Sequence, residues 1–378
     1  MRKIGRDDKK PLILFSPLDW GMGHTTRCIP LLTSLLESGC EVLVACNSTQ
    51  KIILENELPN LRFVDLEGYE VRVAGKNGFT KLKIVAQITN ILTKIKGENR
   101  WLSRFLNSNK VDAVISDNRY GLYNAFVTCI FITHQLRPYS GLGLFIDAIM
   151  QRFLYSYVNK FHSCWIPDYQ HPPGLAGNLS HAQKKPKIPV SYIGCMSRLQ
   201  ISQTHVDINN ELLIILSGPE PQRSLFENLL LEELAKAPED LKSRTIIIRA
   251  RPSASSTKQY INGITCYDHV HANHLSALAH QSAFIISRSG YTTLMDMFKL
   301  KKKMILVPTP GQAEQEYLAE VCAKNNYALS YRQHSFSLLH ALNAAKAFNY
   351  SLPEFDMELY KKTVNEFSKA LLLNHAGS

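Results

Sequence analysis

Short apolar runs alternate along this chain with longer stretches of helical periodicity, and this alternation limits its possible folds more than any other feature. In the first half, residues 12–15, 41–46 and 61–64 have the length and apolar content of buried strands. Helical stretches at 29–38 and 50–57 lie between them. Strands that alternate with helices predict a parallel sheet whose crossover helices cover both faces.

The alternation continues to residue 132, lapses, and then resumes. Five prolines and two glycines fall within residues 167–192, which indicates a domain boundary. The remaining predicted strands are 111–115, 128–132, 211–216, 244–249, 264–267, 283–286 and 303–307, and the later helices are 221–236, 290–300 and 312–325. We therefore predict an α/β protein with two Rossmann-like, doubly wound parallel-sheet domains. The expected division is an N-terminal domain at 1–170, a linker at 171–199, a second domain at 200–353, and a C-terminal helix at 354–378 that packs back toward the N-terminal domain.

The formal net charge of +11 predicts an anionic partner, such as a phosphate-bearing ligand, nucleic acid or an anionic membrane. The sequence has neither an RNA-binding nor a helix-turn-helix signature, so nucleic acid is not expected. Eight cysteines without CxxC or Cys/His spacing indicate reduced thiols and no structural zinc. The absence of an apolar signal-peptide core and of an uninterrupted spanning run predicts a cytoplasmic protein.

The first predicted strand is followed by a glycine turn, Gly21 and Gly23, and then by His24. The turn is neither a Walker A loop nor a dinucleotide fingerprint, since the third glycine position carries Thr26. The pKa of an unperturbed imidazole lies near neutral pH, so His24 could act as a general base toward a sugar hydroxyl. The alternative is a histidine that only caps or positions the helix.

Two further polar residues should reach the same edge of the first sheet. Asp117 follows the strand at 111–115, and it could orient His24 and raise the basicity of the imidazole. It could equally be the N-cap of the next helix. His134 follows the strand at 128–132, where it is either a ligand-binding or a structural histidine.

The second half has two comparable turns. Ser217 and Gly218 end a strand and Arg223 begins the next helix, where it could face a phosphate or simply lie on the surface. At the second turn Gly290 permits close approach of a ligand. Thr292 and Thr293 follow it there, beside the N–H groups of a first helical turn. Such helix N-termini attract anions.

Three polar residues complete the candidate site in the second half. Asp296 lies one helical turn after Thr293, and its carboxylate could accept from both hydroxyls of a ribose, or it could be a solvated acid. Glu314 and Gln315 open the helix that follows the strand at 303–307. They could bind sugar hydroxyls or be ordinary helix-start residues.

Taken together, these residues resemble those of glycosyltransferases of the GT-B class. The chain is similar to the MurG-type N-acetylglucosaminyltransferases, with their glycosyltransferase 28 C-terminal-like domain, and to related bacterial proteins with a GxGHxxR start. The resemblance covers nearly the whole chain, and its most specific parts are 287–290 with Thr293 and Asp296, then 308–311 and 314–315. It implies two domains that face a cleft, with a nucleotide sugar, specifically a UDP-sugar, on the C-terminal domain.

The resemblance also implies roles for individual residues. The expected nucleotide-sugar ligands are Ser217, Gly218, Arg223, Arg288, Ser289, Gly290, Thr292, Thr293, Asp296, Glu314 and Gln315. Acceptor binding is assigned to Gly21, Gly23, Arg27 and His134, and catalysis to His24 and Asp117. The sequence departs from the family pattern in three places: it has Asp296 where glutamate is usual, Pro219 and Pro221 in the first phosphate loop, and Thr25-Thr26-Arg27 after His24.

The implied reaction is transfer of the sugar to an acceptor hydroxyl on a glycan, a lipid-linked molecule or a small molecule. Helix N-termini together with Arg223 or Arg288 would stabilise the departing diphosphate. No DxD motif is present, so neither a metal nor another cofactor is expected, and inversion is the usual outcome in the family. The alternatives are a UDP-sugar 2-epimerase-like enzyme and a non-catalytic nucleotide-sugar-binding protein.

A basic, amphipathic stretch at residues 81–110 could lie on anionic lipid. Its basic residues are Lys81, Lys83, Lys94, Lys96, Arg100, Arg104 and Lys110. The alternative is an ordinary helix that packs its apolar face on the sheet. Because residues 142–158 form a second apolar stretch, we expect peripheral contact with the inner face of the cell membrane.

Overall fold

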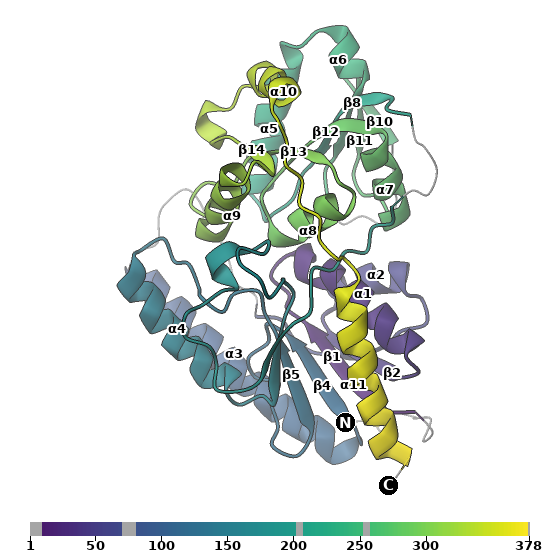
Figure 1. Cartoon of the computed structure of the whole chain (residues 1–378), viewed down its shortest axis with the longest axis vertical. Coiled ribbons are helices and arrows are strands. Elements are labelled where there is room, and N and C mark those ends of the chain that lie inside the picture. The colour runs from purple at the N-terminus through teal and green to yellow at the C-terminus, as the bar shows by residue number, and fades with distance from the viewer. Residues whose placement is uncertain (1–9, 70–80, 202–206, 252–257, 377–378) are drawn as a thin grey trace. The chain divides into compact units, whose positions relative to one another are not determined.

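The computed structural model describes residues 10–69, 81–201, 207–251 and 258–376, with side chains except at 81–89 and 374–376. The expectation that the first nine residues form no signal-peptide core lies outside these residues. The chain divides into two compact units. The N-terminal unit comprises residues up to 196 together with 356–378, and the C-terminal unit comprises 197–355. Each unit is an α/β domain around one sheet, as the alternation predicts (Figure 1).

The sheet of the N-terminal unit has seven strands in the order β3-β2-β1-β4-β5-β6-β7 within the described residues, and every pair is parallel. The strands are β1 (Leu12–Pro17), β2 (Glu41–Cys46), β3 (Arg62–Asp65), β4 (Ala113–Asp117), β5 (Thr128–Ile132), β6 (Ser163–Ile166) and β7 (Val190–Tyr192). The chain moves outward from β1 to β3 and then returns to the other side of β1. The point between β1 and β4 is therefore the topological switch point, where crevices form beyond the carboxyl ends of strands.

Helices cover both faces of this sheet. They are α1 (Met22–Glu37), α2 (Ser48–Glu57), α3 (Lys81–Ser108), α4 (Leu144–Val158) and α11 (Leu359–Ala376), with a short 3-10 turn, η1 (Gly177–Leu179). Residues of β1 alternate between two cores: Ile13 and Phe15 pack on one face, and Leu12 and Leu14 on the other. A strand that is buried on both faces loses the polar alternation of an exposed strand, which explains the continuous apolar run in the sequence.

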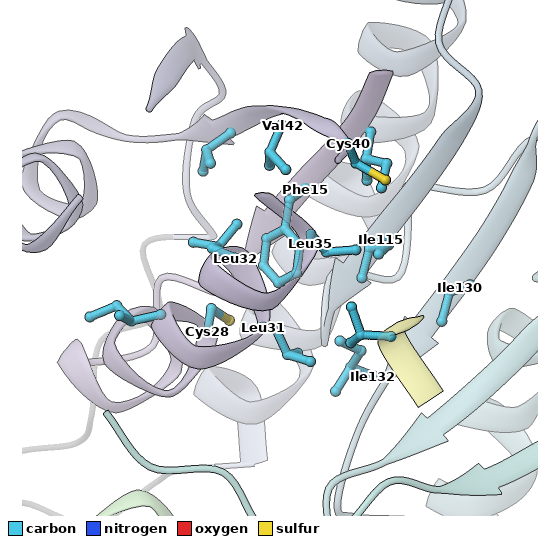
Figure 2. Packing of buried hydrophobic residues seen from close by; sticks show 14 of the residues in the cluster. Phe15, Cys28, Leu31, Leu32, Leu35, Cys40, Val42, Ile115, Ile130 and Ile132 are labelled. Atoms are coloured by element: carbon cyan, nitrogen blue, oxygen red, sulfur yellow. The ribbon is translucent and has the colours of Figure 1, made fainter. Parts of the chain in front are cut away.

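The helix α1 is held firmly against its face of the sheet. Leu32 and Leu35 lie beside Phe15 of β1, as Figure 2 shows, and Leu31 enters the same core. All four side chains are essentially inaccessible to solvent. Each such leucine contributes about 2 kcal/mol through removal of apolar surface from water. The first turn of α1, which carries the GxGH motif, is thus fixed by the packing of the turns that follow.

The C-terminal helix α11 packs beside α1 and belongs to the N-terminal unit, as Figure 1 shows in yellow and purple. Tyr360 and Val364 enter the same core as α1. Ser38 donates a hydrogen bond from Oγ to Asn365 Oδ1 at 2.7 Å. The end of the chain therefore completes the first domain.

The expected linker at 171–199 differs from what the structure contains. Most of it belongs to the N-terminal unit, it includes β7, and the two units divide between Met196 and Ser197. The buried Asp168 organises the segment, because its carboxylate accepts from the backbone N–H groups of Leu175 at 2.7 Å and Ala176 at 3.0 Å. Prolines and glycines stop helices here, yet one buried acid supplies the partners that hold the segment in a fixed fold.

The C-terminal unit repeats the doubly wound plan, with sheet order β10-β11-β9-β8-β12-β13-β14. Its strands are β8 (Asn210–Ile215), β9 (Thr245–Ile248), β10 (Lys258–Ile261), β11 (Ile264–Tyr267), β12 (Ser282–Ser287), β13 (Lys303–Leu306) and β14 (Ala328–Ser330). All neighbours pair in parallel except β10 and β11, which form an antiparallel hairpin that the alternation did not predict. The switch point lies between β8 and β12.

The helices of this unit connect the strands and cover the sheet. They are α5 (Gln222–Ala235), α6 (Glu239–Ser243), α7 (Ala272–His280), α8 (Tyr291–Lys299), α9 (Ala313–Lys324) and α10 (Leu338–Ala347), with a 3-10 turn, η2 (Gln333–Ser335). Phe226 and Leu230 of α5 pack on Leu212 and Ile214 of β8 in one buried core. The helices α5, α8 and α9 each begin at the carboxyl edge of the sheet, where the glycine turns were predicted.

Candidate functional site

The predicted catalytic residues meet at the switch point of the N-terminal sheet. Pro17, the last residue of β1, is the register partner of Asp117, the last residue of β4. Gly21 has φ +76°, in the region that favours glycine, and it is the N-cap of α1. The turn therefore brings His24, in the first turn of α1, to the end of the neighbouring strand.

Gln50 of α2 holds this turn in place, a role that sequence reasoning missed. Its Nε2 group donates to the carbonyl oxygens of Pro17 at 3.2 Å and Leu18 at 3.0 Å, and to Thr25 Oγ1 at 3.2 Å. Gln50 also closes a capping box with Asn47 at the start of α2. The Asn-x-x-Gln spacing of the capping box is visible in the sequence. The contacts of Gln50 with the glycine turn are tertiary and cannot be read from that spacing.

His24 and Asp117 form a close pair. His24 Nδ1 lies 2.9 Å from Asp117 Oδ2, and the imidazole is 18% exposed whereas the carboxylate is fully buried. A carboxylate only accepts, so Nδ1 carries the proton and Nε2 keeps its lone pair. This is the geometry of a general base with an orienting acid.

The charges around this pair affect both pKa values. Burial opposes ionisation of Asp117, but the Arg27 guanidinium and then His24 outweigh it, so the pKa of Asp117 is well below its usual range. The pKa of His24 is lowered, first by burial and then by Arg27, despite the opposing effect of Asp117. At neutral pH, Asp117 is therefore a carboxylate and His24 a neutral imidazole.

Arg27 is not an open ligand-binding residue. It is 2% exposed, and its Nε atom donates to Asp117 Oδ2 at 3.2 Å while Nη2 donates to Asp117 Oδ1. Its Nη1 atom lies 3.3 Å from Nδ1 of His134, which is also buried. The expected acceptor-binding residues Arg27 and His134 thus form a second layer behind His24, while Gly21 and Gly23 lie in the partly accessible turn.

A buried ionic cluster next to Asp117 was also missed from the sequence. Arg119 is fully buried, and its Nε atom donates to Glu98 Oε1 of α3 at 2.6 Å. Glu98 Oε2 accepts from the Tyr69 hydroxyl at 2.6 Å and from the Gly121 backbone at 3.0 Å. The cluster ties the loop after β4 to α3. The sequence analysis did not single out Glu98, because its partners come from distant parts of the chain.

In the C-terminal unit, Arg288 joins three loops at the switch point. Its guanidinium donates from Nη1 to the carbonyl oxygens of Val307 at 3.0 Å and Pro308 at 3.1 Å, and from Nη2 to Gln222 at 3.1 Å. It also stacks over the Phe226 ring at 4.0 Å. No carboxylate of the described residues pairs with it, and burial lowers its pKa to about 10. Arg288 therefore joins these loops by hydrogen bonds to their carbonyl oxygens. Its positive charge at this edge of the sheet is not neutralised by an ion pair within the described part of the chain.

Two glycines shape this edge. Gly218 has φ +94°, which a larger residue rarely adopts. Gly290, the N-cap of α8, has an ordinary φ of −69°, and an added Cβ would meet only Thr293 Oγ1, at 3.9 Å. The fold itself therefore does not require glycine at 290. Thr292 and Thr293 are half-buried in the first turn of α8, which contains no acidic residue.

Two of the predicted nucleotide-sugar ligands, Ser289 and Gln315, are occupied in part by contacts within the unit. Ser289 is buried and donates from Oγ to the Gln315 carbonyl at 2.7 Å. Gln315 Oε1 accepts from the Thr309 backbone at 2.9 Å. These bonds join the loops after β12 and β13. Glu314 is half-buried at the start of α9.

Asp296 is 8% exposed and accepts a hydrogen bond at Oδ1 from the Ser197 hydroxyl. Burial raises its pKa to about 6, although Arg198, Ser197 and Lys299 act in the opposite direction. Lys299 also donates to the Ser197 carbonyl at 3.3 Å. The predicted ribose-binding carboxylate is thus engaged with the first residue of its own unit.

Arg223 lies beside the loop after β8, but its guanidinium already has partners. Nη1 donates to the Ala250 carbonyl at 3.1 Å, and Nη2 pairs with Glu220. Glu220 is half-exposed, so this pair can open at little cost. Ser217 and Gly218 lie in the same loop, partly and fully accessible respectively.

Within the described residues, no group of three or more His, Cys, Asp or Glu side chains is arranged to hold a metal ion. None of the helices in that part of the chain combines the length and apolar character that crossing a bilayer requires. All eight cysteines are free and buried.

Comparison with known proteins identifies relatives of this fold. Residues 215–367 match the sequence model of the glycosyltransferase family 28 C-terminal domain. No curated protein matches the chain. The crystal structure of the glycotransferase of kitacinnamycin is 14% identical, with a TM-score of 0.63 over 97% of this chain and 96% of that chain.

Two further solved structures are similar at the same level. The calicheamicin glycosyltransferase CalG4 is 12% identical, with a TM-score of 0.60 over 97% of this chain and 95% of its own. The spinosyn rhamnosyltransferase SpnG complexed with thymidine diphosphate is 12% identical, with a TM-score of 0.58 over 96% of each chain. The chain therefore has the two-domain α/β fold of GT-B glycosyltransferases.

Proposed function

We propose that this protein is a glycosyltransferase that moves a sugar from a nucleotide sugar, specifically a UDP-sugar, to an acceptor hydroxyl. The observation that carries the proposal is the pairing of His24 with Asp117 at one switch point, together with the anion-attracting loops around Arg288 at the other. The match of residues 215–367 to the family 28 domain supports the donor side. SpnG has been solved with thymidine diphosphate and with the spinosyn aglycone, which supports a nucleoside diphosphate donor and a separate acceptor.

His24 is the proposed base. Its Nε2 atom takes the proton of the acceptor hydroxyl while the hydroxyl oxygen forms a bond to the anomeric carbon. The bond from that carbon to the diphosphate oxygen breaks, and the diphosphate leaves with the electron pair. Attack opposite the leaving group inverts the configuration at that carbon. The Asp117 carboxylate stabilises the imidazolium that forms, as acids paired with catalytic histidines do.

The departing diphosphate gains negative charge, which this proposal places at the first turn of α8, beside Gly290, Thr292 and Thr293. Backbone N–H groups at helix N-termini are already oriented, so they stabilise charge without reorganisation. The Arg288 cation lies behind the same loops. We propose that these groups do the work without a metal, and that Asp296 and Gln315 bind the ribose and sugar hydroxyls.

A nucleotide-sugar panel tests the function. Thermal shift with UDP-, dTDP-, GDP- and CMP-sugars identifies the donor, and the matching diphosphates show whether the sugar contributes to binding. Chelator-treated protein is then assayed with that donor and candidate acceptors, with and without Mg²⁺. Epimerisation of UDP-N-acetylglucosamine without an acceptor would indicate the 2-epimerase reaction instead, and binding without any turnover would indicate a non-catalytic protein.

For the acceptor side we propose contact with anionic lipid at the inner face of the cell membrane, through α4 and not through α3. Apolar residues of α3 such as Leu102 and Phe105 are buried in the core against the sheet. They are therefore not available to contact lipid. The side chains of Lys81 and Lys83 lie outside the described residues. In contrast, α4 exposes large apolar side chains, and Leu142 just before the helix is exposed as well. Those of α4 are Leu144, Phe145, Ile149 and Phe153.

Charge around this face favours a lipid surface. Between residues 118 and 206 the sequence contains only two carboxylates, Asp147 and Asp168, and both are buried. The exposed charges near α4 are therefore basic, among them Arg152 and Lys160. An apolar face flanked by cations is typical of interfacial helices.

Co-sedimentation with vesicles tests this surface. The protein should bind vesicles that contain phosphatidylserine more strongly than phosphatidylcholine vesicles, and the double variant Phe145→Ser, Ile149→Ser should lose binding. Phe126→Ser is the matched control, because Phe126 is 95% exposed in the loop between β4 and β5. Equal behaviour of the two variants would contradict the assignment to α4. A lipid-linked acceptor would then lose its main support.

A further inference from the structure

Arg27 is a buried cation beside the proposed base, and its guanidinium contacts both Asp117 and His134. Its side chain is 2% exposed, one turn after His24 on α1. Both oxygens of Asp117 accept hydrogen bonds from it. A bidentate contact of this kind fixes the plane of a carboxylate as well as its position.

We propose that Arg27 is a positioning residue, which holds Asp117 ionised and turned toward His24 and keeps the His24 imidazole neutral with Nε2 open to the acceptor. The inference rests on the proposed role of His24 as the base. It replaces the expectation that Arg27 binds the acceptor, since a guanidinium that is buried and paired in this way cannot reach a ligand without breaking the pair.

The contacts of Asp117 explain why an arginine is needed. Oδ2 accepts from His24 at 2.9 Å and from Arg27, and Cys28 Sγ lies 3.6 Å away. Oδ1 accepts from Arg27 and from Asn118 Nδ2 at 3.3 Å. Without Arg27, a fully buried carboxylate would have only the imidazole to balance its charge, and it would draw a proton onto His24 or onto itself.

His134 is the third titratable group that faces this cluster. Arginine nitrogens only donate, so His134 Nδ1 must accept from Arg27 and its proton must lie on Nε2. The groups that act on His24 are therefore Arg27 on the same helix, Asp117 from β4 and His134 from the loop after β5, and Arg27 is the only permanent cation among them.

The test uses Arg27→Met and Arg27→Lys in the full-length protein. Removing a cation beside an imidazole favours the imidazolium, so the His24 pKa should rise in Arg27→Met by about one unit or more. The acid limb of the kcat/KM profile should move to higher pH by the same amount. Arg27→Lys keeps the charge but not the bidentate geometry, so it should lower kcat while the limb stays near its wild-type position.

Long-range ¹H–¹⁵N spectra of the histidine rings provide a readout that does not depend on turnover. They report the tautomer and the titration of His24, assigned by its loss in His24→Asn. Arg62→Met is the matched control, because Arg62 is half-exposed and pairs with Glu41 in the same unit. If Arg27 has only a structural role, Arg27→Met and Arg27→Lys will both lower thermal stability without changing the His24 titration. That result would overturn the proposal.

The two hypotheses fail in different ways. If no nucleotide sugar supports turnover in the wild type, the proposed function is wrong, but the NMR titration still decides the role of Arg27. If turnover is present and the His24 titration is the same in wild type and Arg27→Met, the function stands and the role of Arg27 is wrong.

Discussion

The two switch points share a topology but balance charge differently. At the first, the buried Asp117 carboxylate is compensated within the protein by Arg27 and His24. At the second, the buried Arg288 guanidinium donates to backbone carbonyls and stacks on the Phe226 ring, and no carboxylate of the described residues pairs with it. A compensated cluster suits internal proton transfer, whereas an uncompensated cation suits the reception of an external anion. This difference is what we expect if the proposed base lies in one domain and the proposed anion site in the other.

The largest expected effect separates catalysis from binding. His24→Ala should lower kcat by roughly 10³-fold, since general bases contribute about 10² to 10⁴, while nucleotide affinity stays unchanged. Steady-state kinetics and thermal shift with the donor measure the two quantities. The control is His171→Ala, at an exposed position of the same unit. Full turnover with an unchanged pH profile would rule out His24 as the base.

The next effect concerns the uncompensated cation. Arg288→Met removes three hydrogen bonds to backbone carbonyl oxygens, which should lower the free energy of unfolding of the C-terminal unit by about 4 kcal/mol. All three tryptophans lie in the N-terminal unit, so their fluorescence follows that unit alone, whereas circular dichroism follows both. In urea, the dichroism midpoint should fall while the fluorescence midpoint does not.

Arg244→Met is the control for that measurement, because Arg244 is exposed and its ion pairs with Asp240 and Glu211 contribute little. If Arg288→Met lowers unfolding stability no more than this control, the guanidinium does not hold the loops together. The contrast between the two switch points would then lose its energetic basis.

A smaller effect depends on pH. The pKa of Asp296 is about 6 in the folded protein and near 4 in an unfolded chain, so between these values the folded state binds more protons. The free energy of unfolding of the wild type therefore falls as pH rises from 4 to 7, by up to about 3 kcal/mol from this group. Asp296→Asn removes this dependence.

We therefore measure the urea concentration at the midpoint of unfolding by circular dichroism at several pH values. The midpoint of Asp296→Asn should rise relative to that of the wild type as the pH increases toward 7. Ser197→Ala sharpens the result, because loss of the donor to Oδ1 should raise the Asp296 pKa further. A stability difference between Asp296→Asn and wild type that stays constant from pH 4 to 7 would contradict the raised pKa.

The smallest effect tests the glycine that the fold does not require. Gly290→Ala should leave unfolding stability unchanged, because its Cβ meets only ordinary van der Waals contact. Nucleotide affinity should fall roughly tenfold, or about 1.4 kcal/mol, if the diphosphate approaches the backbone there. Titration calorimetry measures this. Gly97→Ala, at an open position inside α3, should leave nucleotide affinity unchanged and raise unfolding stability slightly, because alanine favours a helix over glycine. Unchanged affinity in Gly290→Ala would place the ligand elsewhere.

Much of the fold follows from local pattern, because buried parallel strands are continuous apolar runs. The ranges 41–46, 128–132 and 264–267 coincide with β2, β5 and β11. The short strands β6, β7, β10 and β14 were not predicted. For β7, the prolines and glycines before it suggested a linker. Its pairing with β6 is a tertiary contact that periodicity does not encode.

The candidate site divides in the same way. The pairing of His24 with Asp117 could be predicted, because each residue follows a strand and adjacent parallel strands end at one edge. The burial of Arg27 and Arg288 could not, since a guanidinium in a loop or near the start of a helix looks solvent-exposed until its partners are known. Gln50 and Glu98 were missed for the same reason: their nearest tertiary contacts are 25 and 21 residues away in the chain.

The helix α11 makes the order of folding run against the order of synthesis. Because its residues complete the core around α1, the N-terminal unit cannot close this core until α11 has emerged from the ribosome. Residues 197–355, in contrast, form a continuous unit that is complete before α11. A nascent chain arrested before residue 356 should therefore contain a folded C-terminal unit, while in the N-terminal unit the apolar residues that α11 covers remain exposed. Chaperones that recognise apolar surfaces would bind the N-terminal unit until α11 has emerged.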